Sequence, residues 1–267
     1  MRPTAGDWHA IATAAETAVA PFLDGPTAAD NKLSQGYDPV TEADRAVERA
    51  VRAVIAERFP NDAVLGEEYG SEGGASDRRW VIDPIDGTRA FVAGVPVWMT
   101  LVGLEEAGRS VAGLAVQPVT GERYLARGGE AVRHWRGRER RLAARATSPG
   151  EAVLMTTDPA LLTGASGEAF AAMRDEARLV RYSADAYAVC ALAAGHVQVV
   201  VECGVQPYDV GAVIPIVEAA GGVMTTWTGG RPEAGGDVVA AASPELHAWA
   251  LAHLRGAATP PAVTPAH

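Results

Sequence analysis

The chain has 267 residues, 48% of them hydrophobic and 21% charged, which is ordinary for a globular protein with a large buried core. Its 33 acidic residues outnumber its 23 basic ones, and the net charge of −10 argues against a nucleic-acid partner, which requires a basic surface. A small phosphorylated ligand is compatible with this charge, because bound cations can reverse the local sign.

The distribution of cysteines and apolar residues indicates a cellular location. Cys190 and Cys203 are too few for a disulfide framework and lie in mostly apolar stretches, so we expect reduced, buried thiols. No apolar segment follows Met1, and no run of 18 apolar residues occurs. We therefore expect a cytoplasmic protein that is neither exported nor inserted in a membrane.

The first half of the chain begins with helical segments and continues with extended ones. Residues 7–23 and 41–59 predict helices, the second with a clear apolar face, and residues 31–40 and 70–77 predict loops. Strand patterns follow at 63–65, 80–82, 97–104, 111–116, 123–125 and 152–155. The links in the middle of the chain are too short for crossover helices, so we expect mainly antiparallel neighbours there.

Helices and strands alternate in the second half. Helix patterns cover 167–176, 185–194, 207–220 and 243–255, and strand patterns cover 179–182, 197–202, 223–225 and 238–241. The Ala- and Pro-rich residues 256–267 predict a disordered tail. We therefore expect one domain over residues 1–255, with an α/β fold.

Residues 80–88, Trp-Val-Ile-Asp-Pro-Ile-Asp-Gly-Thr, are the most informative stretch. An apolar run typical of a buried strand stops at Asp83, and a second carboxylate, Asp86, follows three residues later. Gly87 and Thr88 then open a short helical segment. Two acids at a strand end, beside free backbone N–H groups, suit a divalent metal and a phosphate together. The alternative is an ordinary Asp-Gly surface turn.

A second acidic pair favours the metal interpretation. Glu67 and Glu68 follow the apolar segment 63–65, and adjacent carboxylates repel one another unless a cation relieves them. None of the six histidines forms a metal-binding pair with another, which disfavours transition metals. An all-oxygen set of acids favours Mg²⁺.

The remaining acids each have a structural alternative. Asp44 stands three residues after Thr41, the spacing of a helix capping box. Asp209 and Asp185 open predicted helices, where an acid commonly answers the helix dipole. Glu202 ends a predicted strand and is ambiguous by itself.

Four motifs in this order resemble the inositol monophosphatase family of lithium-sensitive, Mg²⁺-dependent phosphatases. They are Pro-Val-Thr-Glu-Ala-Asp at 39–44, Gly-Glu-Glu at 66–68, the stretch 83–88, and Tyr-Asp at 208–209 followed by Glu-Ala-Ala-Gly-Gly at 218–222. The resemblance runs from the first helix to about Leu254. It implies a layered αβαβα sandwich and, usually, a homodimer.

The resemblance also implies a role for each residue of the motifs. Two to three Mg²⁺ ions would be bound, the first by Glu67, Asp83 and the Ile85 carbonyl, and the second by Asp83, Asp86 and Asp209, with a weaker third ion near Glu67. The phosphate would accept N–H bonds from Gly87 and Thr88. An activated water would attack phosphorus in line, oriented and deprotonated by the Thr88 hydroxyl paired with Asp44, with Glu68 nearby.

The substrate is predicted from the flanking stretches, which resemble the histidinol-phosphate phosphatase branch of the family. These stretches are 87–91, 94–101 and 202–209, where Tyr208 replaces the Trp usual in inositol enzymes. Histidinol phosphate carries an ammonium group, so Glu202 and Asp185 are its expected partners, and Arg89 is a further expected substrate contact. The chain departs from that branch at Ala90, Met99 and Ala186.

Other functions fit the sequence less well. A metal-dependent nuclease would need a basic groove, and an inactive binding module would have lost a ligand position, whereas all are filled here. Within the phosphatases, the alternative is a broad inositol- or sugar-phosphate phosphatase. Fructose-bisphosphate or phosphoadenosine-phosphate hydrolysis is disfavoured, because the chain lacks the longer insertions typical of those relatives.

Overall fold

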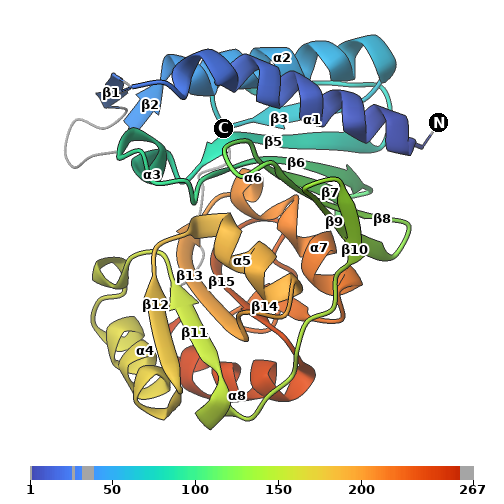
Figure 1. Cartoon of the computed structure of the whole chain (residues 1–267). Helices are drawn as coiled ribbons and strands as arrows, with labels where there is room; N and C mark the ends of the chain where they lie inside the picture. Colours follow the sequence, from blue (N-terminus) through green and yellow to red (C-terminus); the bar gives the residue numbers. More distant parts are fainter. Residues whose placement is uncertain (1, 26–27, 32–38, 259–267) are drawn as a thin grey trace, which may run out of the picture.

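The structure, a computed structural model, describes residues 2–25, 28–31 and 39–258. Helices and sheets alternate in five layers, with α1 and α2 above a large sheet, α5, α6 and α7 between the sheets, a smaller sheet below, and α4 and α8 at the bottom (Figure 1). The predicted layered αβαβα sandwich of the α/β class is confirmed. No helix within the described ranges is both long and apolar enough to cross a membrane.

The first layer forms as the periodicity predicts. α1 (Ala5–Val19) continues into a short 3₁₀ turn (Ala20–Phe22), and α2 (Glu42–Arg58) buries Val47, Val51 and Ile55 against the large sheet. The predicted loop 31–40 instead contributes to a small ladder at its ends, where β1 (Ala29–Asn31) pairs with β2 (Pro39–Thr41). Residues 32–38 of that predicted loop lie outside the described residues.

The large sheet has the strand order β10-β9-β8-β7-β6-β5-β3-β4. All its neighbours are antiparallel except β3 and β5, which are parallel. The antiparallel prediction is confirmed for the strands at 97–104, 111–116 and 123–125, and it is wrong for 152–155, which lies in the smaller sheet between two parallel neighbours. The strands are β3 (Ala63–Gly66), β4 (Gly70–Glu72), β5 (Arg78–Asp86), β6 (Met99–Glu106), β7 (Arg109–Gln117), β8 (Glu122–Arg127), β9 (Glu130–Trp135) and β10 (Arg138–Arg141).

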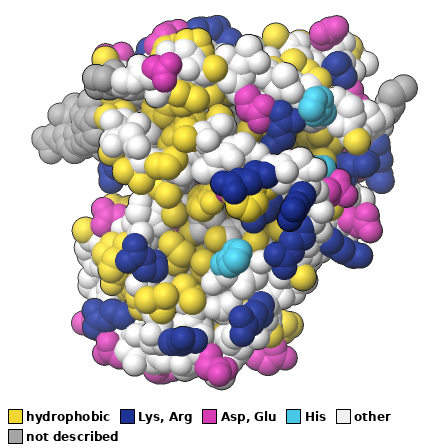
Figure 2. All heavy atoms as spheres, in the orientation of Figure 1, with side chains coloured by type: hydrophobic (Ala, Val, Ile, Leu, Met, Phe, Trp, Pro, Cys, Tyr) yellow, Lys and Arg dark blue, Asp and Glu magenta, His cyan; other side chains and the backbone are white. Residues whose placement is uncertain are grey.

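The sequence pattern does not predict three strands of this sheet, namely the edge strands β4 and β10 and the strand β9 beside β10. β4 lies in a segment predicted as a loop, and all four residues of β10 are exposed and charged, so neither shows an apolar alternation. Figure 2 shows Lys and Arg side chains gathered over this part of the molecule. Charged side chains on an edge strand disfavour pairing with another chain. Because such a strand has no alternating apolar residues, it cannot be predicted from the hydrophobic pattern of the sequence.

The smaller sheet has the order β12-β11-β13-β15-β14, with β11 parallel to both its neighbours and the remaining pairs antiparallel. Its strands are β11 (Val153–Thr156), β12 (Leu179–Tyr182), β13 (Val199–Val205), β14 (Val223–Thr226) and β15 (Gly236–Ala241). The remaining helices that lie on it are α4 (Ala165–Glu176), α5 (Asp185–Ala193) and α8 (Pro244–Leu254). Of the predicted tail, residues up to 258 are described and include a 3₁₀ turn (Arg255–Ala257), whereas 259–267 lie outside the described residues.

The helix predicted over 207–220 is interrupted at its contact with the large sheet. It divides into α6 (Pro207–Val210) and α7 (Val213–Ala219), and the break at Gly211 and Ala212 lies directly on two glycines of the sheet. A Cβ on Gly103 would lie 2.6 Å from the Gly211 carbonyl carbon, and one on Gly113 would lie 1.9 Å from the Ala212 carbonyl oxygen. The two missing side chains therefore let the central helix layer approach β6 and β7 and fix the position of α6.

We expect Gly113→Ala to destabilise the protein by about 1–3 kcal/mol, the usual cost of overpacking, because the atoms it meets belong to the backbone and cannot rotate away. The measurement is the free energy of unfolding in urea. Gly73→Ala is the control, since nothing lies within 4 Å of its added Cβ. Equal stability of the two variants would contradict the close approach described here.

Candidate metal centre

Three carboxylates from two elements meet at the end of β5. Oxygens of Asp83 and Asp86 in β5 and of Asp209 in α6 all lie within 4.8 Å of one another. In a regular strand, residues three apart point to opposite faces. The pairing of β5 with β6 shifts register between Asp83 and Asp86, and this irregularity lets both side chains reach the same site.

The irregular end of β5 is held by local contacts. The fully buried Thr100 donates its hydroxyl to the Pro84 carbonyl at 2.7 Å. Gly87 then turns the chain into α3 (Thr88–Val92) with φ of 85°, a conformation that favours glycine. A Cβ on Gly87 would also lie 2.9 Å from the Asp185 carboxylate, so this position requires glycine for two reasons.

The electrostatics of the cluster is unfavourable without a cation. Burial, and then the charges of Glu67, Asp86 and Asp209, raise the pKa of Asp83 well above its usual range. Burial, and then Asp185 and Asp209, do the same to the pKa of Asp86, although an N–H bond from Ala186 opposes the shift. The buried Asp83 Oδ1 has no hydrogen-bond partner in the part of the chain that the structure describes. These residues fit a divalent cation, which would satisfy the free oxygen and neutralise the repulsion.

Glu67 approaches the same cluster from the turn after β3. Its backbone N–H donates to the Ile82 carbonyl at 3.1 Å, which ties the turn to β5. A hydrogen bond between the side chains of Glu67 and Asp83 also contributes to the raised pKa of Asp83. Glu68, the next residue, is also near Asp44, because the charges of both Glu67 and Glu68 act on the Asp44 carboxyl. The structure thus brings together both acidic pairs singled out in the sequence.

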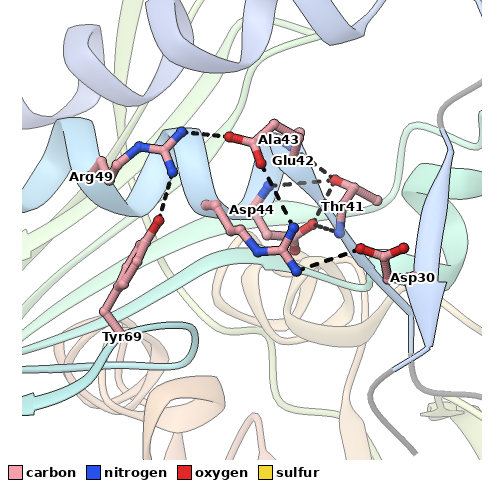
Figure 3. A network of polar contacts seen from close by, with 8 residues as sticks. Asp30, Thr41, Glu42, Ala43, Asp44, Arg49 and Tyr69 are labelled. Carbon is pink, nitrogen blue, oxygen red and sulfur yellow. Dashed lines mark hydrogen bonds and ion pairs between the residues drawn. The ribbon is translucent and has the colours of Figure 1, made fainter.

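Asp44 forms the predicted capping box with one carboxylate oxygen, and its other oxygen makes no hydrogen bond to the residues that the structure describes. Its Oδ2 accepts the N–H of Thr41 at 2.7 Å and the Thr41 hydroxyl at 2.6 Å (Figure 3). Its buried Oδ1 has no partner among the residues with described positions. Burial, helped by the charges of Glu67 and Glu68, raises the pKa of Asp44 to about 6, against the effect of the Thr41 bonds. Oδ2 of Asp44 therefore caps the helix, and Oδ1 is left for a functional role.

The predicted hydrogen bond between Thr88 and Asp44 is wrong for this structure. The Thr88 hydroxyl donates instead to the Ile85 carbonyl at 3.0 Å, because this acceptor lies three residues back in the same turn. A hydroxyl has one hydrogen, so it cannot serve both acceptors at once. The Ile85 side chain is buried in the core, and only its carbonyl is available for a polar role.

A cavity of about 180 Å³ extends from the metal carboxylates to the smaller sheet. Its polar wall includes Asp185 and Glu202, and its floor is apolar, with Val189, Val200 and Met224 among the lining residues. Burial raises the pKa of Glu202 to about 8, reinforced by the charges of Asp185 and Asp209. Arg89 is exposed, and its charge opposes the rise that burial causes in the pKa of Asp185, to about 6.

Sequence reasoning missed Thr157, which holds Glu202 in this cavity. Its backbone N–H and its hydroxyl donate to Glu202 Oε1 at 2.9 and 3.0 Å, and its side chain is also near enough to Asp185 to oppose the rise in the pKa of that carboxyl. The only signal in the sequence is a threonine just past the apolar strand 152–155, which is too common to mark a site. Thr157 links the end of β11 to β13 and α5, elements that only the fold brings together.

The turn into α5 is strained next to the site. Ser183, Ala184 and Asp185 have consecutive positive φ values of 71°, 93° and 41°, a conformation that costs a non-glycine residue about 1–3 kcal/mol. The Ser183 N–H donates to the carbonyls of Thr156 and Thr157, which stabilises the turn. The turn places the Ala186 N–H on Asp86 Oδ2 at 2.7 Å and the Asp185 carboxylate beside Gly87. Because strained backbone conformations are often kept at functional sites, the strain in this turn beside a charged cavity supports a functional role for the turn.

Comparisons with known proteins match the chain to one family. The sequence profile of the inositol monophosphatase family matches residues 5–258. Bifunctional phosphatase IMPL2 of Arabidopsis thaliana is 37% identical over 81% of this chain, and the chain spans 65% of that protein's length. A histidinol-phosphatase of Chlorobaculum parvum is 38% identical over 72% of this chain and 73% of its own length. The structure of an inositol monophosphatase from Zymomonas mobilis superimposes with a TM-score of 0.81 at 34% identity, covering 93% of this chain and 96% of that one.

We expect Mg²⁺ to raise the melting temperature, because a ligand that binds only the folded state stabilises it, by about 2.7 kcal/mol at a hundred times its dissociation constant. Asp83→Asn should abolish this rise and should also stabilise the metal-free protein, since it removes one repelling charge. Differential scanning calorimetry with NaCl at equal ionic strength as the control measures both effects. A Mg²⁺-induced rise that survives in Asp83→Asn would place the ion elsewhere.

Proposed function

We propose that this chain, which belongs to the inositol monophosphatase family of metal-dependent phosphatases, hydrolyses histidinol phosphate with the help of Mg²⁺. The proposed requirement for Mg²⁺ is supported by the buried carboxylate cluster, in which Asp83 Oδ1 has no hydrogen-bond partner among the described residues. The proposed substrate is supported by the cavity that adjoins this cluster and is lined by acidic residues. From the family resemblance we also propose that the protein is a cytoplasmic homodimer, in which a small phosphate monoester is the binding partner.

The proposed metal ligands are residues that converge at the end of β5. We propose Glu67, Asp83 and the Ile85 carbonyl for one Mg²⁺, and Asp83, Asp86 and Asp209 for a second, with a third ion near Glu67. When bound, Mg²⁺ would supply positive charge to the phosphoryl oxygens and acidify the attacking water. An ion at the Ile85 carbonyl would also compete with the Thr88 hydroxyl that now occupies this acceptor.

The chain's own groups would then position phosphate and water. The N–H groups of Gly87 and Thr88, at the start of α3, would donate to phosphate oxygens. The free, buried Oδ1 of Asp44 would accept the proton of the attacking water, either directly or through the Thr88 hydroxyl after this leaves Ile85. Glu68 would support Asp44 by its neighbouring charge.

The cavity favours an alcohol with a cationic group. Glu202 and Asp185 lie in its wall, and Thr157 fixes the position of the Glu202 carboxylate. Because burial and the neighbouring acids disfavour the charged form of Glu202, an ammonium group there would gain a charge-assisted hydrogen bond and relieve repulsion. The exposed Arg89, close enough to act on Asp185, would contact the substrate at the cavity entrance.

A second function is favoured by one finding. The inositol monophosphatase from Zymomonas mobilis covers almost the whole chain. In an inositol- or sugar-phosphate phosphatase, Glu202 and Asp185 would accept hydrogen bonds from hydroxyl groups instead of pairing with an ammonium group. The two functions differ in the charge of the leaving alcohol and share the metal centre.

We expect Mg²⁺-dependent hydrolysis of a phosphate monoester, lost with chelator and restored by added Mg²⁺. Asp86→Asn should raise the Mg²⁺ concentration needed for half-maximal activity and remove most of the turnover, because it loses a ligand. Asp44→Asn should leave Mg²⁺ binding close to that of the wild type and lower kcat by roughly 10²–10⁴-fold, the usual loss for an acid–base group. If Asp44→Asn lowers only the melting temperature, the residue is a helix cap alone.

The substrate is tested by wild-type kcat/KM for histidinol phosphate against inositol 1-phosphate. We expect histidinol phosphate to be preferred, and Glu202→Gln to raise its KM by roughly 10–150-fold, because a charge-assisted hydrogen bond contributes about 1.5–3 kcal/mol. Hydrolysis of an uncharged aryl phosphate by Glu202→Gln is the internal control and should change far less. A clear preference for inositol 1-phosphate would reject histidinol phosphate and favour the second function.

A further inference from the structure

Glu48 is a fully buried carboxylate that none of the proposed ligand or catalytic roles uses. It lies one helical turn after Asp44 on α2, and its Oε2 accepts the backbone N–H of Glu68 at 2.8 Å. Its Oε1 accepts the backbone N–H of Tyr69 at 3.3 Å and the Arg52 Nε at 2.8 Å. One side chain of α2 therefore binds the backbone of the turn that carries Glu67 and Glu68.

The glycine before this turn leaves room for the same carboxylate. A Cβ on Gly66 would lie 1.9 Å from Glu48 Oε1 and 2.4 Å from its Cδ. No other residue fits at this position while the Glu48 side chain keeps its place. The Gly-Glu-Glu sequence at 66–68 thus combines a site for the Glu48 carboxylate with the two acids that it positions.

Two arginines of α2 extend the contact along the turn. Arg52 pairs with Glu48 and donates through Nη2 to the Gly70 carbonyl at 2.5 Å. Arg49 donates to the Tyr69 hydroxyl at 2.6 Å (Figure 3). On the opposite side, the Glu67 N–H binds the Ile82 carbonyl of β5. The turn is therefore fixed between α2 and β5.

We propose that Glu48 is a positioning residue of the metal centre, which holds the turn 67–69 so that Glu67 stays at Asp83 and Glu68 stays beside Asp44. This proposal rests on the role of Glu67 as a metal ligand in the proposed function. The repulsion between Glu67 and the other acids would drive the turn outward before a cation binds. The backbone bonds to Glu48 oppose that movement, and Arg52 balances the charge that Glu48 itself adds.

The test compares two buried carboxylates that each pair with an arginine. Glu48→Gln keeps the volume of the side chain and removes the charge that the two N–H groups and Arg52 require. We expect it to raise the Mg²⁺ concentration for half-maximal activity roughly 10–100-fold, as the loss of an outer partner of a metal ligand usually does, with kcat at saturating Mg²⁺ close to that of the wild type. Calorimetric titration of Mg²⁺ should show the same change in affinity.

Glu105→Gln is the matched control, because Glu105 is buried and pairs with Arg79 at 2.8 Å near the other end of β5. It should lower stability and leave Mg²⁺ affinity unchanged. Unchanged Mg²⁺ affinity in Glu48→Gln would overturn the positioning role, provided that Asp86→Asn still loses Mg²⁺. If Asp86→Asn also binds Mg²⁺ normally, the proposed metal site itself fails.

A milder variant keeps the test decisive if Glu48→Gln does not yield folded protein. Arg52→Lys leaves the bonds from Glu48 to the turn but replaces the guanidinium that joins Glu48 to the Gly70 carbonyl. A several-fold loss of Mg²⁺ affinity in this variant supports the positioning role. Wild-type affinity in a folded Arg52→Lys protein counts against it.

Discussion

Repulsion among buried carboxylates is the constraint on which this structure depends. Asp83 and Asp86 are buried beside one another and near four further acids, Glu67, Asp185, Glu202 and Asp209, so burial and like charge act in the same direction on both. Charged groups without partners are costly in a protein interior, and the rest of the fold must hold them in place until a cation arrives. The register shift in β5, the glycine contacts under α6 and the anchored turn after β3 all serve this positioning.

The same local device recurs at three of the acids. Asp44, Asp86 and Asp209 each use Oδ2 to accept a backbone N–H at a helix start, from Thr41, Ala186 and Gln206, and each of these distances is 2.7 Å. A carboxylate has two oxygens, so a helix-terminal bond fixes the side chain and leaves the second oxygen for other chemistry. Helix capping and metal binding are therefore compatible uses of such residues. The capping box predicted at Asp44 is confirmed, and Asp209, for which only a helix-dipole role was predicted, forms a capping box as well.

Local patterns in the sequence predicted most helices and strands and marked the acids that converge, whereas the layered fold was implied by the resemblance to the inositol monophosphatase family. The strand that ends in Asp83, the amphipathic α2 and the four acidic motifs are all visible as runs of residue types. What escaped prediction depends on contacts between distant segments. The break between α6 and α7 follows from glycines about a hundred residues earlier, and the charged edge strand β10 shows no apolar alternation. Likewise, Thr157 gains its role only because β11 lies between β12 and β13.

The site is divided between the two sheets, and this division separates chemistry from specificity. Asp83 and Asp86 come from the large sheet, and Glu67 from the turn beside it, whereas Thr157, Asp185 and Glu202 come from the ends of the smaller sheet and its helix. Asp209, on the helix layer packed between them, and the bond from the Ala186 N–H of α5 to Asp86 Oδ2 link one side to the other. Under the proposed function, the carboxylate cluster would carry the metal chemistry, and the charge of the leaving alcohol would be selected on the other side of the site, at Glu202 and Asp185.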